Sequence, residues 1–528
     1  MLDILIRQGN IIDGTGQPKR KGNIGIKDGR IVFIDSREVA AKEIIEAESL
    51  VVAPGFIDIH SHSDVCSFIM PESSTSKLYQ GITLEIGGNC GISCLPVDDM
   101  SRARLTEFFK TALQLPLGDK VLQDDTLLEY EQHIASYPPF VNIGLLIGHG
   151  TLRGLVVGMG MEKATLEQLN TMCSILDREL SFGAFGMSLG LIYPPSSYGD
   201  SEEIIALSKV IKKHNAMLTV HLRSENDGVF EAVDEMLAIA KATGVHLQIS
   251  HLKLMGKKQW GRAEELLAKL RRAREDGIYV TSDQYPYMAS STGLSALVPK
   301  WAHAGGAQEM CKRLQQPDEK ILLEITEEIE RRGGSDAVLI VGTHGTNIEF
   351  EGLRLSEISE RLKLEPANVV AKILVAAGGG VDCCYFSMTE SDVLTIMKEP
   401  YIAVGSDGYA YTYDKSFLTT NPHPRSFGSF PKYFEMVREH NILSLEQAVA
   451  KATGVTADIL GLSDRGFLKP GYVADIVVFD YHTIRDNSTY VDSIQKPKGI
   501  EHVIISGQLA LTNGKAVKKP LGKLVKHE

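Results

Sequence analysis

The chain has 528 residues, of which 43% are hydrophobic and 23% are charged, and its formal net charge is −12. This acidic balance disfavours non-specific binding to nucleic acid or to anionic membranes, because both need a basic surface. No run approaches the ~20 apolar residues of a membrane-spanning helix, and the first residues lack the sustained apolar segment of a signal peptide. We therefore expect a cytoplasmic protein that acts on small molecules.

Short predicted strands with tight turns occupy both ends of the chain. Asp13-Gly14 and Asp28-Gly29 separate apolar runs near the start, and Asn513-Gly514 follows a similar run near the end. These dipeptides favour hairpins, because both central residues of a type I′ turn need positive φ. Neither set of strands is a stable sheet alone. We expect residues 1–53 and 466–528 to form one discontinuous β-sandwich domain.

Between these ends, residues 54–465 alternate apolar strands with amphipathic helical segments. Repeated β-α units predict a parallel sheet, either a (β/α)₈ barrel or a doubly wound sheet. The barrel is favoured because no glycine-rich dinucleotide or phosphate loop follows the first strand. Residues 286–340 interrupt the rhythm and predict an insertion that can cover the site. The expected strands cover 56–59, 83–86, 141–147, 185–188, 217–220, 247–250, 278–281 and 401–404.

Two histidines close the first of these strands. Side chains alternate along a strand, so His60 and His62 project to the same side, with Cα atoms roughly 6.5 Å apart. This geometry suits a metal ion or a polarised water. The alternative is a surface loop that carries two histidines without a ligand, so the remaining ligands must come from elsewhere in the chain.

Further polar residues close other strands, and a barrel presents its chemistry at those ends. His221 and His251 are 30 positions apart (251 minus 221), about one β-α unit, so they are expected on adjacent strands. With Cys90 they make a three-ligand zinc set that leaves one position for water or substrate. Asp407 closes the last strand, and Asp283 and Tyr285 follow another. We expect hydrogen-bonded structural roles for His149, His246, His303 and His344.

The seven cysteines are an odd number scattered along the chain. This pattern favours free thiols in a reducing compartment over a disulfide framework. All except Cys90 are expected to be small packed residues: Cys66, Cys94, Cys173, Cys311, Cys383 and Cys384.

Several motifs together resemble the metal-dependent amidohydrolase superfamily, beginning with Pro-Gly-Phe-Ile-Asp-x-His-x-His (54–62) and Gly-Ser-Asp-Gly (405–408). Five more narrow the resemblance to the N-acyl-D-amino-acid deacylases, also called D-aminoacylases, over residues 3–515. The cysteine is the most discriminating point, because most other superfamily members bridge their metals with a carboxylated lysine or an acid. The five motifs are Gly-Asn-Cys-Gly-Ile-Ser (88–93), Gly-His-Gly-Thr-Leu-Arg (148–153), Ile-Ser-His-Leu-Lys (249–253), Ser-Asp-Gln-Tyr-Pro-Tyr (282–287) and Pro-His-Pro-Arg (422–425).

The resemblance implies zinc-dependent hydrolysis of the amide bond of N-acyl-D-amino acids. It implies a tightly held zinc on Cys90, His221 and His251, and a weaker second metal position near His60, His62 and Asp407. Asp407 is then expected to be the general base and acid, taking a proton from water and passing it to the departing nitrogen.

The substrate carboxylate also needs a partner. Arg425 offers a planar fork for it, with Lys253 and Tyr285 as further donors, and the resemblance points to the same three positions. The alternative is that Lys253 and Arg425 form ordinary surface ion pairs.

One segment departs from the family pattern. Residues 409–421 form a longer, tyrosine-bearing loop, which leaves the preferred amino-acid side chain open. A cyclic-amide hydrolase of the hydantoinase or dihydroorotase kind is an alternative, although those enzymes prefer a carboxylated lysine where Cys90 stands. A non-catalytic binding protein is another. Such a relative should have lost ligands, and all six metal-competent positions remain.

Overall fold

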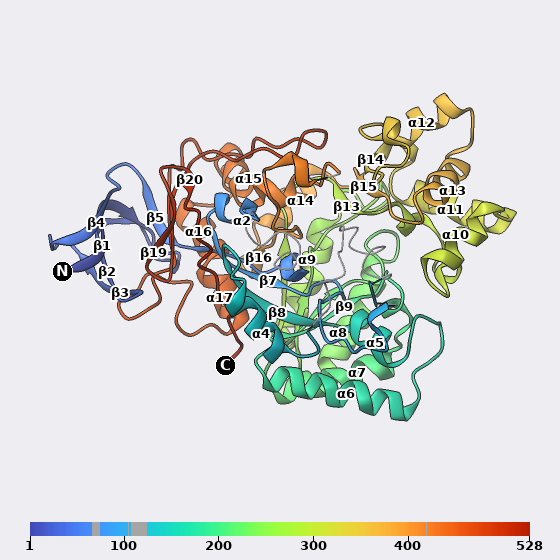
Figure 1. Ribbon diagram of the computed structural model, residues 1–528, viewed down its shortest axis with the longest axis horizontal. Coiled ribbons are helices and arrows are strands. Elements are labelled where there is room, and N and C mark those ends of the chain that lie inside the picture. Colours follow the sequence, from blue (N-terminus) through green and yellow to red (C-terminus); the bar gives the residue numbers. More distant parts are fainter. Residues whose placement is uncertain (66–73, 104, 107–123, 419) are drawn as a thin grey trace.

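The computed structural model describes residues 1–65, 74–103, 105–106, 124–418 and 420–528, so Cys66 lies outside the described residues. Figure 1 shows strands from both ends of the chain together at the left, a barrel with its helices in the centre, and a separate group of strands and helices at the upper right. Within the described ranges, none of the helices combines the length and apolar character that crossing a membrane requires.

A barrel of eight parallel strands forms the centre of the molecule. Its sheet runs in the order β16-β12-β11-β10-β9-β8-β7-β6. A parallel bridge between Ser61 and Gly408 joins the two edge strands, beside a 2.8 Å bond from the Asp407 N–H to the His60 carbonyl. The predicted (β/α)₈ barrel is therefore confirmed. Its strands are β6 (Phe56–Asp58), β7 (Ile82–Gly87), β8 (Asn142–Gly148), β9 (Gly186–Gly190), β10 (Met217–His221), β11 (His246–Ile249), β12 (Val280–Gln284) and β16 (Ile402–Val404).

Helices follow most of these strands and bury one face against the barrel. In α8 (Val229–Thr243) the buried positions include Val229, Val233, Met236 and Ala240, a spacing that places them on one stripe of a helix. Gly244 ends this helix in the left-handed region, at φ 68°. The other helices outside the insertion are α2 (Ser76–Tyr79), α4 (Leu127–Ser136), α5 (His149–Val156), α6 (Leu166–Ser181), α7 (Ser201–Lys213), α9 (Ala263–Glu275), α14 (Glu390–Met397), α15 (Arg425–His440), α16 (Leu445–Ala452) and α17 (Gly454–Leu460).

Strands from the two chain ends pair into one nine-stranded sheet. The junction is β5 against β17, which are antiparallel with Ala53 opposite Val477. A small β domain built from both termini is thus confirmed. Its strands are β1 (Leu2–Ile11), β2 (Arg20–Lys27), β3 (Arg30–Asp35), β4 (Ala41–Glu46), β5 (Val51–Pro54), β17 (Ile476–Phe479), β18 (Ile500–Ile505), β19 (Gln508–Thr512) and β20 (Lys515–Ala516).

The insertion between β12 and β16 is a folded unit with its own core. A three-stranded antiparallel sheet in the order β13-β15-β14 packs with four helices, around buried residues such as Leu297, Ile325 and Ile373. The unit reaches β15, so the predicted range 286–340 ends inside β14. Its elements are β13 (Ser290–Gly293), α10 (Ala307–Gln315), α11 (Glu319–Arg331), β14 (Val338–Gly342), α12 (Leu355–Leu362), α13 (Pro366–Ala376) and β15 (Asp382–Tyr385).

Candidate metal centre

The candidate ligands all lie at the carboxyl ends of barrel strands. His221 is the last residue of β10, and the other five follow β6, β7, β11 and β16 by two to four residues. Three of these residues have positive φ: Cys90 at 53°, His251 at 37° and Asp407 at 50°. Non-glycine residues rarely adopt this region, and such strained positions concentrate at functional sites. The other three candidate ligands are His60, His62 and His221.

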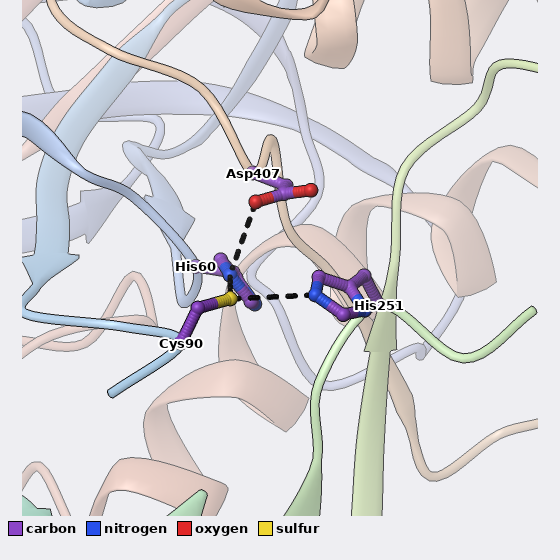
Figure 2. A group of neighbouring side chains, drawn as sticks. All are labelled: His60, Cys90, His251 and Asp407. Atoms are coloured by element: carbon purple, nitrogen blue, oxygen red, sulfur yellow. Dashed lines mark hydrogen bonds and ion pairs between the residues drawn. The ribbon is translucent and has the colours of Figure 1, made fainter. Parts of the chain in front are cut away.

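Four of these side chains converge on one point (Figure 2). Cys90 Sγ lies 3.3 Å from His60 Nε2 and 3.4 Å from His251 Nε2. His60 Nε2 lies 3.3 Å from Asp407 Oδ1, and His62 Nε2 lies 3.0 Å from the same oxygen. One donor atom from each of His60, Cys90, His251 and Asp407 falls within 4.8 Å of the others. This is the spacing of side chains around a shared metal ion.

His221 lies beside His251, and the potential ligand atoms of these two histidines form a second group with Glu225. The two imidazole rings are 4.4 Å apart, centroid to centroid. His221 is buried, and neither of its ring nitrogens has a hydrogen-bond partner among the described residues. Burial also lowers the pKa of His221, which favours the neutral ring that a metal needs. A buried, neutral imidazole whose ring nitrogens make no hydrogen bond within the described ranges fits a metal ligand.

Electrostatics favour the ionised forms of the two acidic ligands. Burial alone would raise the pKa of the Cys90 thiol, but the positive charges of His60 and His251 outweigh it and hold that pKa well below its ordinary value. Burial opposes ionisation of Asp407 too, and the charges of Arg425 and His251 hold its pKa well below the usual range. The thiolate is the form of cysteine that binds zinc.

Glu225, which no sequence motif predicted as a site residue, lies against His221 and His251. Its Oε1 accepts a hydrogen bond from Lys253 Nζ at 2.6 Å and lies 3.0 Å from His251 Nδ1. Its Oε2 lies 3.5 Å from His221 Nε2. Burial would raise the pKa of Glu225, but His221, Lys253 and His251 hold it well below its ordinary value. Glu225 therefore orients two candidate ligands and neutralises a buried lysine.

Asp283 contacts two candidate ligands, His60 and His251, and orients them. One carboxylate oxygen accepts the His251 N–H at 2.9 Å and lies 3.1 Å from His60 Nδ1. From the sequence, Asp283 was expected at a strand end, without a role. A carboxylate on the far nitrogen of a histidine fixes the ring and its tautomer.

A fully buried lysine fastens the two strand ends that carry His60 and Asp407. Lys77 Nζ donates to Asp58 Oδ2 at 2.6 Å and to Ser406 Oγ at 2.7 Å, and it lies 3.4 Å from Glu85 Oε2. Asp58 also accepts the Ser406 N–H at 2.8 Å. Burial would lower the pKa of Lys77, but Asp58 and Glu85 outweigh it and raise that pKa. This network supports the seam where the barrel closes.

The three predicted carboxylate binders lie together beside the cluster. Arg425, the first residue of α15, donates from Nη1 to Asp407 Oδ2 at 2.6 Å and from Nη2 to the Ser291 carbonyl at 3.1 Å. Lys253 Nζ and the Arg425 guanidinium carbon each lie 5.5 Å from the ring centroid of Tyr285. The Tyr285 hydroxyl is buried and lacks a hydrogen-bond partner among the described residues. All three line one cavity with five of the six candidate ligands, all except His60.

Three of the four histidines that were expected to be structural, His149, His246 and His303, are hydrogen-bonded outside the candidate ligands. His149 lies 2.8 Å from both Ser196 Oγ and Glu203 Oε1, and His246 lies 2.7 Å from Thr281 Oγ1. His344 Nε2 has no hydrogen-bond partner among the described residues and lies 3.3 Å from Asp382 Oδ2. The cysteines of the described ranges are free thiols.

Comparison with known proteins gives the family. Residues 402–510 match the model of the Amidohydrolase family. The chain is 35% identical to an N-acyl-D-glutamate deacylase and 33% identical to an N-acyl-D-aspartate deacylase, both from Alcaligenes xylosoxydans xylosoxydans. Each match covers 96% of this chain and at least 91% of the relative. The chain belongs to the N-acyl-D-amino-acid deacylase family of amidohydrolases.

Solved structures agree with this family assignment. An N-acyl-D-glutamate deacylase from Bordetella bronchiseptica, complexed with zinc and a phosphonate inhibitor, matches at 32% identity with a TM-score of 0.83 over 99% of each chain. A D-hydantoinase matches at 16% identity with a TM-score of 0.57, and that likeness shows the barrel fold alone. The family predicted from the motifs around Cys90 is therefore confirmed.

Proposed function

We propose that this chain hydrolyses the amide bond of N-acyl-D-amino acids with the help of bound zinc. The observation that carries the proposal is the convergence of Cys90, His60, His251 and Asp407 next to a cation pair and an unpartnered tyrosine hydroxyl. The deacylase relatives support the same activity. The substrate is a small molecule with a free carboxylate.

Zinc fits the donor set. Cys90, His221 and His251 would hold a tight ion, and His60, His62 and Asp407 would hold a weaker second position. Bound there, zinc supplies Lewis-acid polarisation of the acyl carbonyl and a more acidic water.

The chain's own residues do the remaining work. Arg425, Tyr285 and Lys253 bind the substrate carboxylate and so fix the amide over Asp407. Asp407 takes the proton of the attacking water and passes it to the departing nitrogen. In the structure Arg425 contacts Asp407 directly. A substrate carboxylate that engages Arg425 would weaken this ion pair, raise the pKa of Asp407 and make it a better base.

A chiral substrate panel tests the proposal. Purified protein is assayed with N-acetyl-D- and N-acetyl-L-amino acids and with a hydantoin, beside elemental analysis of bound metal. We expect hydrolysis of the D-enantiomers together with bound zinc. Turnover of the hydantoin alone, or no hydrolysis of any N-acyl-D-amino acid by zinc-loaded protein, would overturn it.

A further inference from the structure

Two connected cavities lie at the metal cluster. The cavity lined by Cys90, His221, His251 and Asp407 has a volume of about 90 Å³, and a neighbouring cavity of about 980 Å³ lies between the barrel and the insertion. A group attached to a substrate at the cluster can therefore extend into the larger cavity. The residues that line both cavities are Ile192, Tyr193, Glu225, Thr292 and Arg332.

Arg332 is the cation at this junction. Glu328 binds one edge of its guanidinium, and the ring of Tyr385 covers one face. Arg332 follows α11 directly, and its side chain is only 9% exposed. Its Nε donates to Glu328 Oε1 at 2.8 Å, and its guanidinium carbon lies 4.7 Å from the ring centroid of Tyr385. Tyr385 is itself fixed, because its hydroxyl donates to the Gly293 carbonyl. Across the described ranges, no hydrogen bond uses Nη1 or Nη2 of Arg332.

The neighbouring carboxylates of Glu328 and Glu225 already have other cations as partners. Glu328 has a second cation, because its Oε2 accepts from Arg331 Nη1 at 2.9 Å. Glu225, across the junction, is neutralised by Lys253 at 2.6 Å and lies 3.0 Å from His251. The Nη1–Nη2 edge of Arg332 is therefore available to a ligand that enters from the metal cluster.

Building on the proposed function, we propose that the substrate carries a second carboxylate and that Arg332 binds it. A fixed guanidinium edge with two parallel donors matches a carboxylate in bidentate geometry. Arg425 is assigned to the carboxylate next to the amide nitrogen, and it lines only the smaller cavity, whereas Arg332 lines both. The second carboxylate belongs either to an acidic amino-acid side chain or to a dicarboxylic acyl group, and the chemistry at Arg332 is the same.

The test compares matched substrate pairs that differ only in this charge. One pair is N-acetyl-D-glutamate and N-acetyl-D-glutamine, for a carboxylate on the side chain. The other is N-succinyl-D-alanine and N-succinamoyl-D-alanine, for a carboxylate on the acyl group. The ratio of kcat/KM within each pair is measured for the wild type, for Arg332→Met and for Arg331→Met. Arg331 is a matched control, since it also lines the larger cavity but pairs through both Nη atoms with Glu327 and Glu328.

We expect the wild type to prefer the acid in one pair, and that pair identifies the source of the carboxylate. Arg332→Met should lower the preference about 10- to 100-fold, the loss expected for one charge-assisted contact, mainly through KM. Arg331→Met should keep it. If Arg332→Met does not fold, Arg332→Lys retains the charge without the fork and should lose part of the preference.

Two results would overturn the proposal. One is a wild type that hydrolyses N-acyl-D-amino acids without preferring the acid in either pair. The other is a preference that survives in the Arg332 variants. Failure of the proposed function looks different, because then the wild type hydrolyses none of the four substrates.

Discussion

Replacing Lys77 with methionine should destabilise the barrel strongly. The side chain of Lys77 is 1% exposed, and its ammonium lies 2.6 Å from one oxygen of Asp58 and 3.4 Å from one oxygen of Glu85. Methionine fills a similar volume but leaves both carboxylates in a dry interior without their cation. Breaking a buried ion pair in this way costs roughly 3 to 5 kcal/mol.

A surface ion pair provides the control. Lys269 and Asp234 are also 2.6 Å apart, but their side chains are 30% and 60% exposed. Lys269→Met should therefore cost no more than about 1 kcal/mol. The same contact distance with different burial isolates the effect of desolvation.

Urea unfolding followed by circular dichroism measures both variants. A second change, Asp58→Asn in the Lys77→Met background, should recover part of the loss, because it removes one of the stranded charges. If Lys77→Met unfolded at the same urea concentration as Lys269→Met, the proposed role of this network at the barrel seam would be refuted.

Three further predictions concern other buried groups. Glu225→Gln should lower kcat/KM about 10- to 100-fold, because Lys253 loses its counter-charge and the ligands lose their support; unchanged kinetics would contradict this. Tyr285→Phe should raise KM for N-acetyl-D-amino acids but not for their amides, whereas Tyr287→Phe, whose hydroxyl is bonded to an aspartate, should raise neither. Burial lowers the pKa of Lys451 to about 7, so above pH 7 the unfolded chain binds more protons. Urea unfolding should then show the wild type gaining about 2 kcal/mol over Lys451→Met between pH 7 and pH 9, and a constant difference would argue against it.

Local sequence patterns predicted the barrel, because each strand is a short apolar run and amphipathic helical segments lie between the runs. The stretch 229–243 carries the apolar spacing of one helix face, and α8 has those bounds. The candidate ligands were found by one rule, that barrel chemistry follows strand ends, and His221 and His251 satisfy it. The hairpin signals at both termini likewise predicted the strands that meet in β5 and β17.

Features that depend on long-range contacts were not predictable in this way. Glu225 lies in the loop between β10 and α8, and only the folded chain shows that it reaches Lys253 and His251. The predicted range of the insertion ended at 340, although the folded unit extends to β15. Its end depends on the pairing of β13 with β15, in which Ser290 lies opposite Tyr385, almost a hundred residues later. Lys77 reads as one charge in a short helix, and its buried partners come from three separate strand ends.

Metal content measured beside turnover tests the central claim most directly. Wild type, Cys90→Ala and His60→Ala are purified without chelator and analysed for zinc and for hydrolysis of an N-acyl-D-amino acid substrate of the wild type. We expect Cys90→Ala to lose the tightly bound zinc together with activity, and His60→Ala to keep zinc while losing most of its turnover. A Cys90→Ala protein that retained both zinc and turnover would contradict the account.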